Sequence, residues 1–127
     1  MLRSLHEGWR REGCLLRLAK SHRIPFLALD ANGKPRLEPL LRALQPDLVC
    51  VASLTHLLRP EVLAIPRLGF INLHPSLLPR YHGPFPWFWQ YHDFRLELGA
   101  TVHEIDCGQD TGRILRQQPV QMAANRV

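Results

Sequence analysis

Helix-type and strand-type segments alternate along the first part of this sequence, and this alternation constrains the fold more than any other feature. Three segments suit a helix, and a short apolar run follows each of them. Regular alternation of this kind predicts an α/β fold with a mainly parallel sheet and helices on both faces. The expected elements, in chain order, are a helix at 12–24, a strand at 26–29, a helix at 37–44, a strand at 48–52, a helix at 60–65 and a strand at 68–73.

The segment after the third expected strand, 75–86, contains four prolines and one glycine and has no helical periodicity. In a parallel sheet, ligands bind beyond the carboxyl ends of the strands, so we expect an ordered loop at the functional edge. Further along, the pattern predicts a helix at 87–94, a strand at 100–105, a turn-rich loop at 106–112 and an extended segment at 113–122. No repeat or linker interrupts the chain, so residues 1–127 are expected to form a single domain.

Composition narrows the class of protein. With 46% hydrophobic and 21% charged residues among 127, the chain is typical of a globular protein and unlike a disordered or fibrous one. The apolar runs are too short to cross a membrane, so we expect no membrane partner and a cytoplasmic location. The net charge of +5 is scattered, and the three cysteines lie far apart, so they indicate neither a disulfide framework nor a thiolate zinc site.

Asn72 and His74 lie two residues apart at the end of an expected strand, and the period of a strand puts both side chains on one face. Asp110 follows the next expected strand, and its carboxylate could reach His74 and orient the imidazole as a proton carrier. The alternatives are structural. Asn72 would bond to loop backbone, His74 would be a buried hydrogen-bonded histidine, and Asp110 would make a turn with Thr111 and Gly112.

Three stretches around these residues carry a family resemblance. They are Asn-Leu-His-Pro-Ser-Leu-Leu-Pro-Arg-Tyr-His-Gly at 72–83, Gly-Ala-Thr-Val-His at 99–103 and Gly-Gln-Asp-Thr-Gly-Arg-Ile at 108–114. Together they resemble the 10-formyltetrahydrofolate-dependent formyltransferases that act on methionyl-tRNA or glycinamide ribonucleotide, and the likeness extends over roughly 14–122. The resemblance implies a Rossmann-like sheet, 10-formyltetrahydrofolate as co-substrate without a metal, and Asn72, His74 and Asp110 as the catalytic residues.

The chemistry explains these residue types. An amide N–H and an imidazole N–H would stabilise negative charge on the formyl oxygen, and a His–Asp pair would move the protons. The resemblance also places the folate near Thr55, Leu57, Leu58, Ile105, Asp106, Cys107 and Gly108, and a substrate loop at Ser76, Leu77, Leu78, Pro79 and Gly83. Trp87, Phe88 and Trp89 are either stacking partners of a ligand or core residues.

The sequence departs from the family pattern at its start. The family begins with a strand, a glycine-containing turn, a helix and a second strand, and the chain is expected to lack this unit and to be truncated at its N-terminus. The fold would then be incomplete relative to the family, and self-association would cover the open sheet edge. The acceptor amine stays open among methionyl-tRNA, an amino sugar and glycinamide ribonucleotide, although residues 81–89 look closer to the first two.

Two other functions compete with formyl transfer. A degenerate relative would bind folate without turnover. A metal-dependent hydrolase would draw its ligands from His74, His82, His92, His103, Asp106 and Asp110, but these residues form no compact metal-binding motif.

Overall fold

The computed structural model describes residues 14–26, 34–54, 56–95 and 97–121, and the chain divides into two compact units, 1–37 and 38–127. The described helix of the first unit, α2 (Cys14–Ser21), confirms the helix expected at 12–24. It ends because Arg23 adopts a left-handed backbone (φ 55°), which lets Ile24 N–H bond to Ala19 O at 2.8 Å. Most of the strand expected at 26–29 lies outside the described residues.

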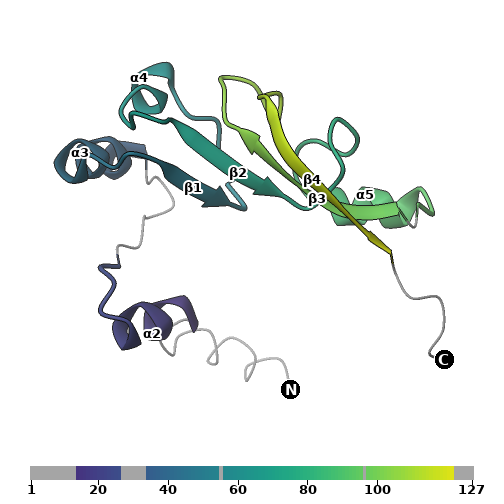
Figure 1. The fold of residues 1–127 in the computed structure, drawn as a ribbon, viewed down its shortest axis with the longest axis horizontal. Coiled ribbons are helices and arrows are strands. Elements are labelled where there is room, and N and C mark those ends of the chain that lie inside the picture. Colours follow the sequence, from purple (N-terminus) through teal and green to yellow (C-terminus); the bar gives the residue numbers. More distant parts are fainter. Residues whose placement is uncertain (1–13, 27–33, 55, 96, 122–127) are drawn as a thin grey trace. The chain divides into compact units, whose positions relative to one another are not determined.

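The second unit contains a sheet of four strands in the order β1-β2-β3-β4 (Figure 1). The strands are β1 (Val49–Ala52), β2 (Phe70–His74), β3 (Glu97–Glu104) and β4 (Ile114–Gln121). β1 and β2 match the expected strands at 48–52 and 68–73 to within two residues, and β3 matches the one at 100–105 but begins three residues earlier. The segment expected to be extended at 113–122 is β4.

Strand direction differs in part from the prediction of a mainly parallel sheet. β1 and β2 are parallel, but β2 pairs antiparallel with β3, and β3 pairs antiparallel with β4. The loop between β3 and β4 is short, and a short connection joins antiparallel neighbours, whereas a parallel pair needs a longer crossover. The α/β class is therefore confirmed, and among the described strands the sheet is mixed rather than mainly parallel.

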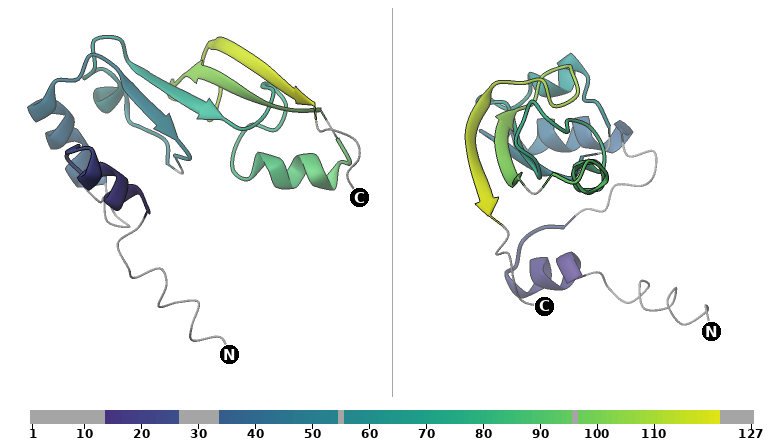
Figure 2. Two further views of the ribbon diagram at one scale, coloured as in Figure 1. Left: turned by 60° about the horizontal axis from the view of Figure 1, so that its bottom comes forward. Right: turned by 90° about the vertical axis from the view of Figure 1, so that its right-hand side faces the viewer.

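Three helices accompany the sheet: α3 (Lys34–Leu44), α4 (Pro60–Leu63) and α5 (Pro86–His92). Both α4 and α5 begin with proline, which suits the first position of a helix because no intrahelical N–H bond is lost there. In both views of Figure 2, α5 lies to one side of the β3–β4 pair. None of the helices in the described ranges is long and apolar enough to cross a membrane.

Buried side chains of the second unit are as much polar as apolar. The buried apolar residues include Leu41, Val62, Phe70 and Leu78. The buried polar residues are Asn72, His74, Ser76, Gln90, Thr101 and His103. Because a buried polar group is destabilising unless it is hydrogen-bonded, this polar cluster must be held by specific bonds, and it marks the part of the sheet where function is to be sought.

Candidate active site

Asn72 and His74 both point to the buried face of β2. Burial alternates along this strand, so Phe70, Asn72 and His74 are enclosed while Leu73 between them is 51% exposed. This is the shared face predicted from the sequence. Phe70 anchors the strand in the apolar core, and the two polar residues follow toward the carboxyl end of the strand.

β3 lies beside β2 and adds two buried polar side chains to the same region. In the antiparallel register, His103 is opposite Asn72, and Thr101 is opposite His74. The amide Nδ2 of Asn72 lies 3.2 Å from Nε2 of His103. A bulge follows Val102 where β3 pairs with β4. His103 is not one of the catalytic residues that the family resemblance implies.

Asp110 comes into contact with these residues from the loop after β3. One carboxylate oxygen, Oδ1, lies 3.4 Å from both Asn72 Nδ2 and His103 Nε2. The other, Oδ2, accepts the Gly83 N–H at 2.7 Å and lies 3.5 Å from His74 Nδ1. Asp110 has a left-handed backbone (φ 54°), which Asp tolerates better than most residues. The structure thus brings Asn72, His74 and Asp110 together.

The side-chain contact with Thr111 that was considered as an alternative role of Asp110 is made by Asp106. Asp106 Oδ1 accepts the Thr111 hydroxyl at 2.7 Å and the Gly108 N–H at 2.9 Å. The Thr111 hydroxyl, with the Gly108 N–H adding to it, holds the pKa of the Asp106 carboxyl below its ordinary value. Because Asp106 organises the loop, the carboxylate of Asp110 is left to face Asn72, His74 and Gly83.

The hydrogen bonds of His74 define the roles of its two ring nitrogens. Nε2 lies 2.8 Å from the backbone oxygen of Tyr81, and a carbonyl oxygen only accepts, so Nε2 carries a proton. In the neutral ring, Nδ1 then has a free lone pair, and this atom faces Asp110. A proton taken up at Nδ1 would produce an imidazolium beside a carboxylate, which is a favourable pair.

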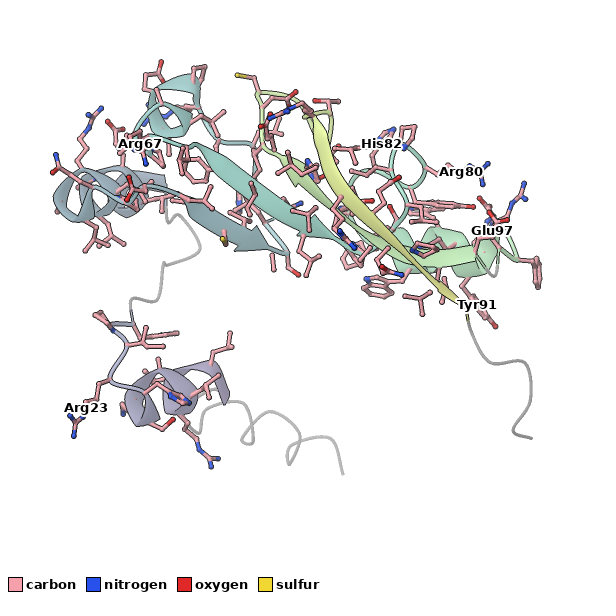
Figure 3. The ribbon with its side chains drawn as sticks, viewed as in Figure 1. Arg23, Arg67, Arg80, His82, Tyr91 and Glu97 are labelled. Atoms are coloured by element: carbon pink, nitrogen blue, oxygen red, sulfur yellow. The ribbon has the colours of Figure 1, made fainter. Side chains whose placement is uncertain are left out.

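The loop between β2 and α5 is fixed to the sheet by polar contacts. The Thr101 hydroxyl donates to Ser76 O at 2.6 Å and accepts the Leu78 N–H at 3.1 Å, while Gln117 Nε2 donates to Leu78 O at 2.7 Å. At the surface, Arg80 and Glu97 point toward each other and form an ion pair of 3.3 Å (Figure 3). The loop is therefore held in place where it supplies Tyr81 O and Gly83 N–H to the site.

A pocket of about 450 Å³ opens over this cluster. Asn72, His74, Asp110 and His103 all line it. Of the other residues predicted for the site, five contribute to the lining besides Gly83: Leu57, Leu58, Ile105, Asp106 and Gly108. Its volume is within the range typical of small-molecule sites.

Five predicted residues do not line the pocket, and a sixth lies outside the described residues. Ser76, Leu77, Leu78 and Pro79 are not among the lining residues, since this part of the loop lies against Thr101 and Gln117 of the sheet. Cys107 is exposed and outside the lining, and Thr55 lies outside the described residues.

Two aromatic residues extend the pocket on the side of α5. Phe85 and Trp87 line it and remain 62% and 59% exposed, with their rings edge to face at a centroid distance of 5.5 Å. Phe88 and Trp89 are exposed and outside the lining. Of the three aromatics weighed as stacking partners or core residues, only Trp87 therefore borders the pocket, and none is core.

Among the described residues, no group of three or more His, Cys, Asp and Glu side chains has an arrangement that could hold a metal ion. His82 and His92, which the hydrolase alternative would need, are both exposed at the surface. The ring of His92 instead contacts the carboxylate of Asp93 at 3.0 Å.

Comparison with known proteins identifies the family. The Formyl transferase family matches residues 10–126. The chain is 41% identical over 107 residues to a methionyl-tRNA formyltransferase of Chloroflexus aggregans, covering 84% of this chain and 35% of the relative. It is 42% identical over 97 residues to the corresponding protein of a Roseiflexus species, covering 76% of this chain and 30% of the relative. The chain thus spans about a third of the length of these curated relatives.

Solved structures show the same likeness. Phosphoribosylglycinamide formyltransferase from Bacillus halodurans superimposes with a TM-score of 0.78 at 28% identity, covering 89% of this chain and 62% of that one. The likeness confirms the Rossmann-like α/β fold expected from the sequence. Because the family match extends over nearly the whole sequence, this chain belongs to the formyl transferase family.

Proposed function

We propose that this protein transfers a formyl group from 10-formyltetrahydrofolate to the nitrogen of an acceptor amine. The observation that carries the proposal is the convergence of Asn72, His74 and Asp110 on one pocket at the end of β2. Family membership supports the reaction type, and the pocket geometry supports the roles of the three side chains.

The pocket has the chemistry that a flat, polar-edged ring needs. Leu54, Leu57, Leu58 and Ile105 supply apolar walls, and the loop around Asp106 and Gly108 supplies polar groups at the rim. Residues of this kind would hold the folate, whose contribution to the reaction is the formyl group itself.

Asn72 Oδ1 is buried and has no hydrogen-bond partner among the described residues, which is unusual for a buried acceptor.

Asn72 would stabilise negative charge on the formyl oxygen during attack. One Nδ2 hydrogen is directed at His103, and the other is directed at Asp110 over a long distance of 3.4 Å. The long, weak contact is the one that a formyl oxygen can replace. Removing one donor from such a site typically lowers the rate by about 10²–10³-fold.

His74 and Asp110 would carry the protons. Nδ1 of His74 has the lone pair, and His74 lines the pocket, so this nitrogen can accept the proton that the attacking amine loses. Asp110 then stabilises the imidazolium, and the same proton can pass to the departing nitrogen. General acid–base catalysis of this kind contributes about 10²–10⁴-fold.

The acceptor is an amine, and the relatives suggest which kinds to test. Their names specify methionyl-tRNA and phosphoribosylglycinamide as the molecules on which those proteins act. For this chain we propose methionyl-tRNA, an amino sugar or glycinamide ribonucleotide as the acceptor. We also propose that the chain self-associates, which its mass in solution would show.

The test is to incubate the purified chain with 10-formyltetrahydrofolate and each of these amines and to measure tetrahydrofolate release. His74→Ala and Asp110→Asn are expected to lower transfer by at least about 10²-fold while the far-ultraviolet circular dichroism stays unchanged. His92→Ala is the matched control because His92 is exposed, does not line the pocket and contacts the carboxylate of Asp93. Equal transfer by the wild type and the two site variants would refute the roles assigned here. Folate binding without release of tetrahydrofolate would favour the degenerate relative.

A further inference from the structure

His103 is a buried titratable residue that the proposed mechanism does not use. Its residue exposure is 1%, and its ring lies edge to face with that of His74 at a centroid distance of 6.3 Å. Each of its ring nitrogens has polar neighbours: Nδ1 lies 2.7 Å from Glu104 O, and Nε2 faces Asn72 and Asp110. A residue that merely filled space here would not need a partner at both ends of its ring.

The hydrogen bonds determine which tautomer His103 adopts. Because Glu104 O is a carbonyl oxygen, it only accepts, so the proton of the neutral ring is on Nδ1. Nε2 is then an acceptor, and the atom 3.2 Å away must be a donor. The Asn72 amide therefore turns its nitrogen, rather than its oxygen, toward His103.

Asp110 independently favours the same orientation of the Asn72 amide. The Asn72 atom that faces His103 also lies 3.4 Å from Asp110 Oδ1. If the amide were flipped, a carbonyl oxygen would face a carboxylate oxygen, which is repulsive. Two neighbours thus select one orientation of Asn72, although this orientation leaves Asn72 Oδ1 buried without a partner in the part of the chain that the structure describes.

We infer that His103 is a positioning residue for formyl transfer: its neutral, Nδ1-protonated ring holds one N–H of Asn72 and so keeps the other in the long contact with Asp110 that a formyl oxygen in the pocket can replace. The inference rests on the proposed function. In the proposed mechanism, His103 touches neither the reacting atoms nor the co-substrate, and it acts through Asn72. The amide of Asn72 would otherwise rotate to give its unpartnered oxygen a donor, and the N–H would leave the formyl oxygen.

Two polar substitutions test the contacts of Nδ1 and Nε2 of His103 separately. In His103→Gln, the side-chain terminus reaches the position of Nε2 and can still accept from Asn72. In His103→Asn, it reaches only the position of Nδ1, so the contact with Glu104 O is kept while the contact with Asn72 is lost. We expect His103→Asn to lower kcat by about 10–100-fold with KM changed by less than about threefold, and His103→Gln to restore most of kcat.

His92→Asn is the control, since the same change is made at an exposed histidine outside the pocket. A spectroscopic readout keeps the inference testable if the substitutions disturb folding: nitrogen NMR of the wild-type chain should show His103 protonated at Nδ1 and unprotonated at Nε2. A proton on Nε2, or equal kcat values for the Gln and Asn variants, would overturn the inference. If the wild type transfers no formyl group at all, the proposed function fails. Two measurements still decide whether His103 holds Asn72: the position of the proton on His103 and the solvent exchange of the Asn72 amide hydrogens.

Discussion

Replacing Thr101 with valine removes the hydroxyl that joins the loop after β2 to the sheet. This hydroxyl donates to Ser76 O, accepts the Leu78 N–H and accepts from Gln117 Nε2 at 3.0 Å, and Thr101 has no exposed surface. Gln117 keeps its bond to Leu78 O, so two buried backbone groups lose their partners. At about 1–3 kcal/mol each, the free energy of unfolding should fall by about 2–6 kcal/mol.

This loss is large against the stability of an ordinary domain, which is about 5–15 kcal/mol. Urea denaturation followed by circular dichroism measures it. Thr101→Ser is the matched control because it keeps the hydroxyl and loses one methyl group, at about 1 kcal/mol. The Thr101→Val variant should also transfer formyl groups more slowly than the wild type, because the loop supplies Tyr81 O to His74 and Gly83 N–H to Asp110. Equal unfolding free energies for the valine and serine variants would refute the view that this hydroxyl holds the loop.

Gly83→Ala places a methyl group at a left-handed position (φ 85°), where the side chain of Gln109 is at ordinary contact distance. Backbone strain rather than a steric clash should therefore lower the stability, by about 1–2 kcal/mol, and thermal denaturation measures this loss. Because the Gly83 N–H also holds Asp110, formyl transfer should fall as well, and unchanged kcat would contradict this. Thr111→Val should raise the pKa of Asp106 toward its ordinary value, as measured by carboxyl carbon NMR, whereas Thr111→Ser should not. A lowered pKa in the folded state contributes stability above the unfolded value of 3.8, and this stability is lost as the pH falls through the folded value. The stability deficit of the valine variant relative to the serine variant should therefore be larger at pH 6 than at pH 2.

Local patterns were sufficient to predict most elements of the second unit. The apolar run at 48–52 and the alternation that ends in Asn72 and His74 are properties of neighbouring residues, and β1 and β2 follow from them. The direction of β3 is different, because it depends on the path of the chain through the proline-rich loop and α5. Periodicity contains no information on that path, so the antiparallel pairing with β2 was missed.

Prediction of the site was limited in the same way, because the pattern of neighbouring residues does not determine how two strands pair. Asn72 and His74 share a face by the period of a single strand, and Asp110 was placed near them because adjacent strand ends meet at one edge. His103 enters only through the register that puts it opposite Asn72, which is a property of two strands together. One signal was available: Thr101 and His103 alternate on β3 as Asn72 and His74 do on β2. The family resemblance placed Cys107 near the folate with the rest of its loop, but in the structure Cys107 is exposed and does not line the pocket.

The positive φ of Asp110 restricts what mutagenesis at this position can measure. Asparagine shares aspartate's tolerance of that region, so Asp110→Asn removes the charge and leaves the peptide geometry accessible. A β-branched or long side chain would combine loss of the carboxylate with a rearranged loop, and any change in rate would then have two inseparable origins. Few amino acids suit the shape of the chain at residue 110, and fewer still suit its chemistry, so sequence variation there should be narrow in any protein built on this loop.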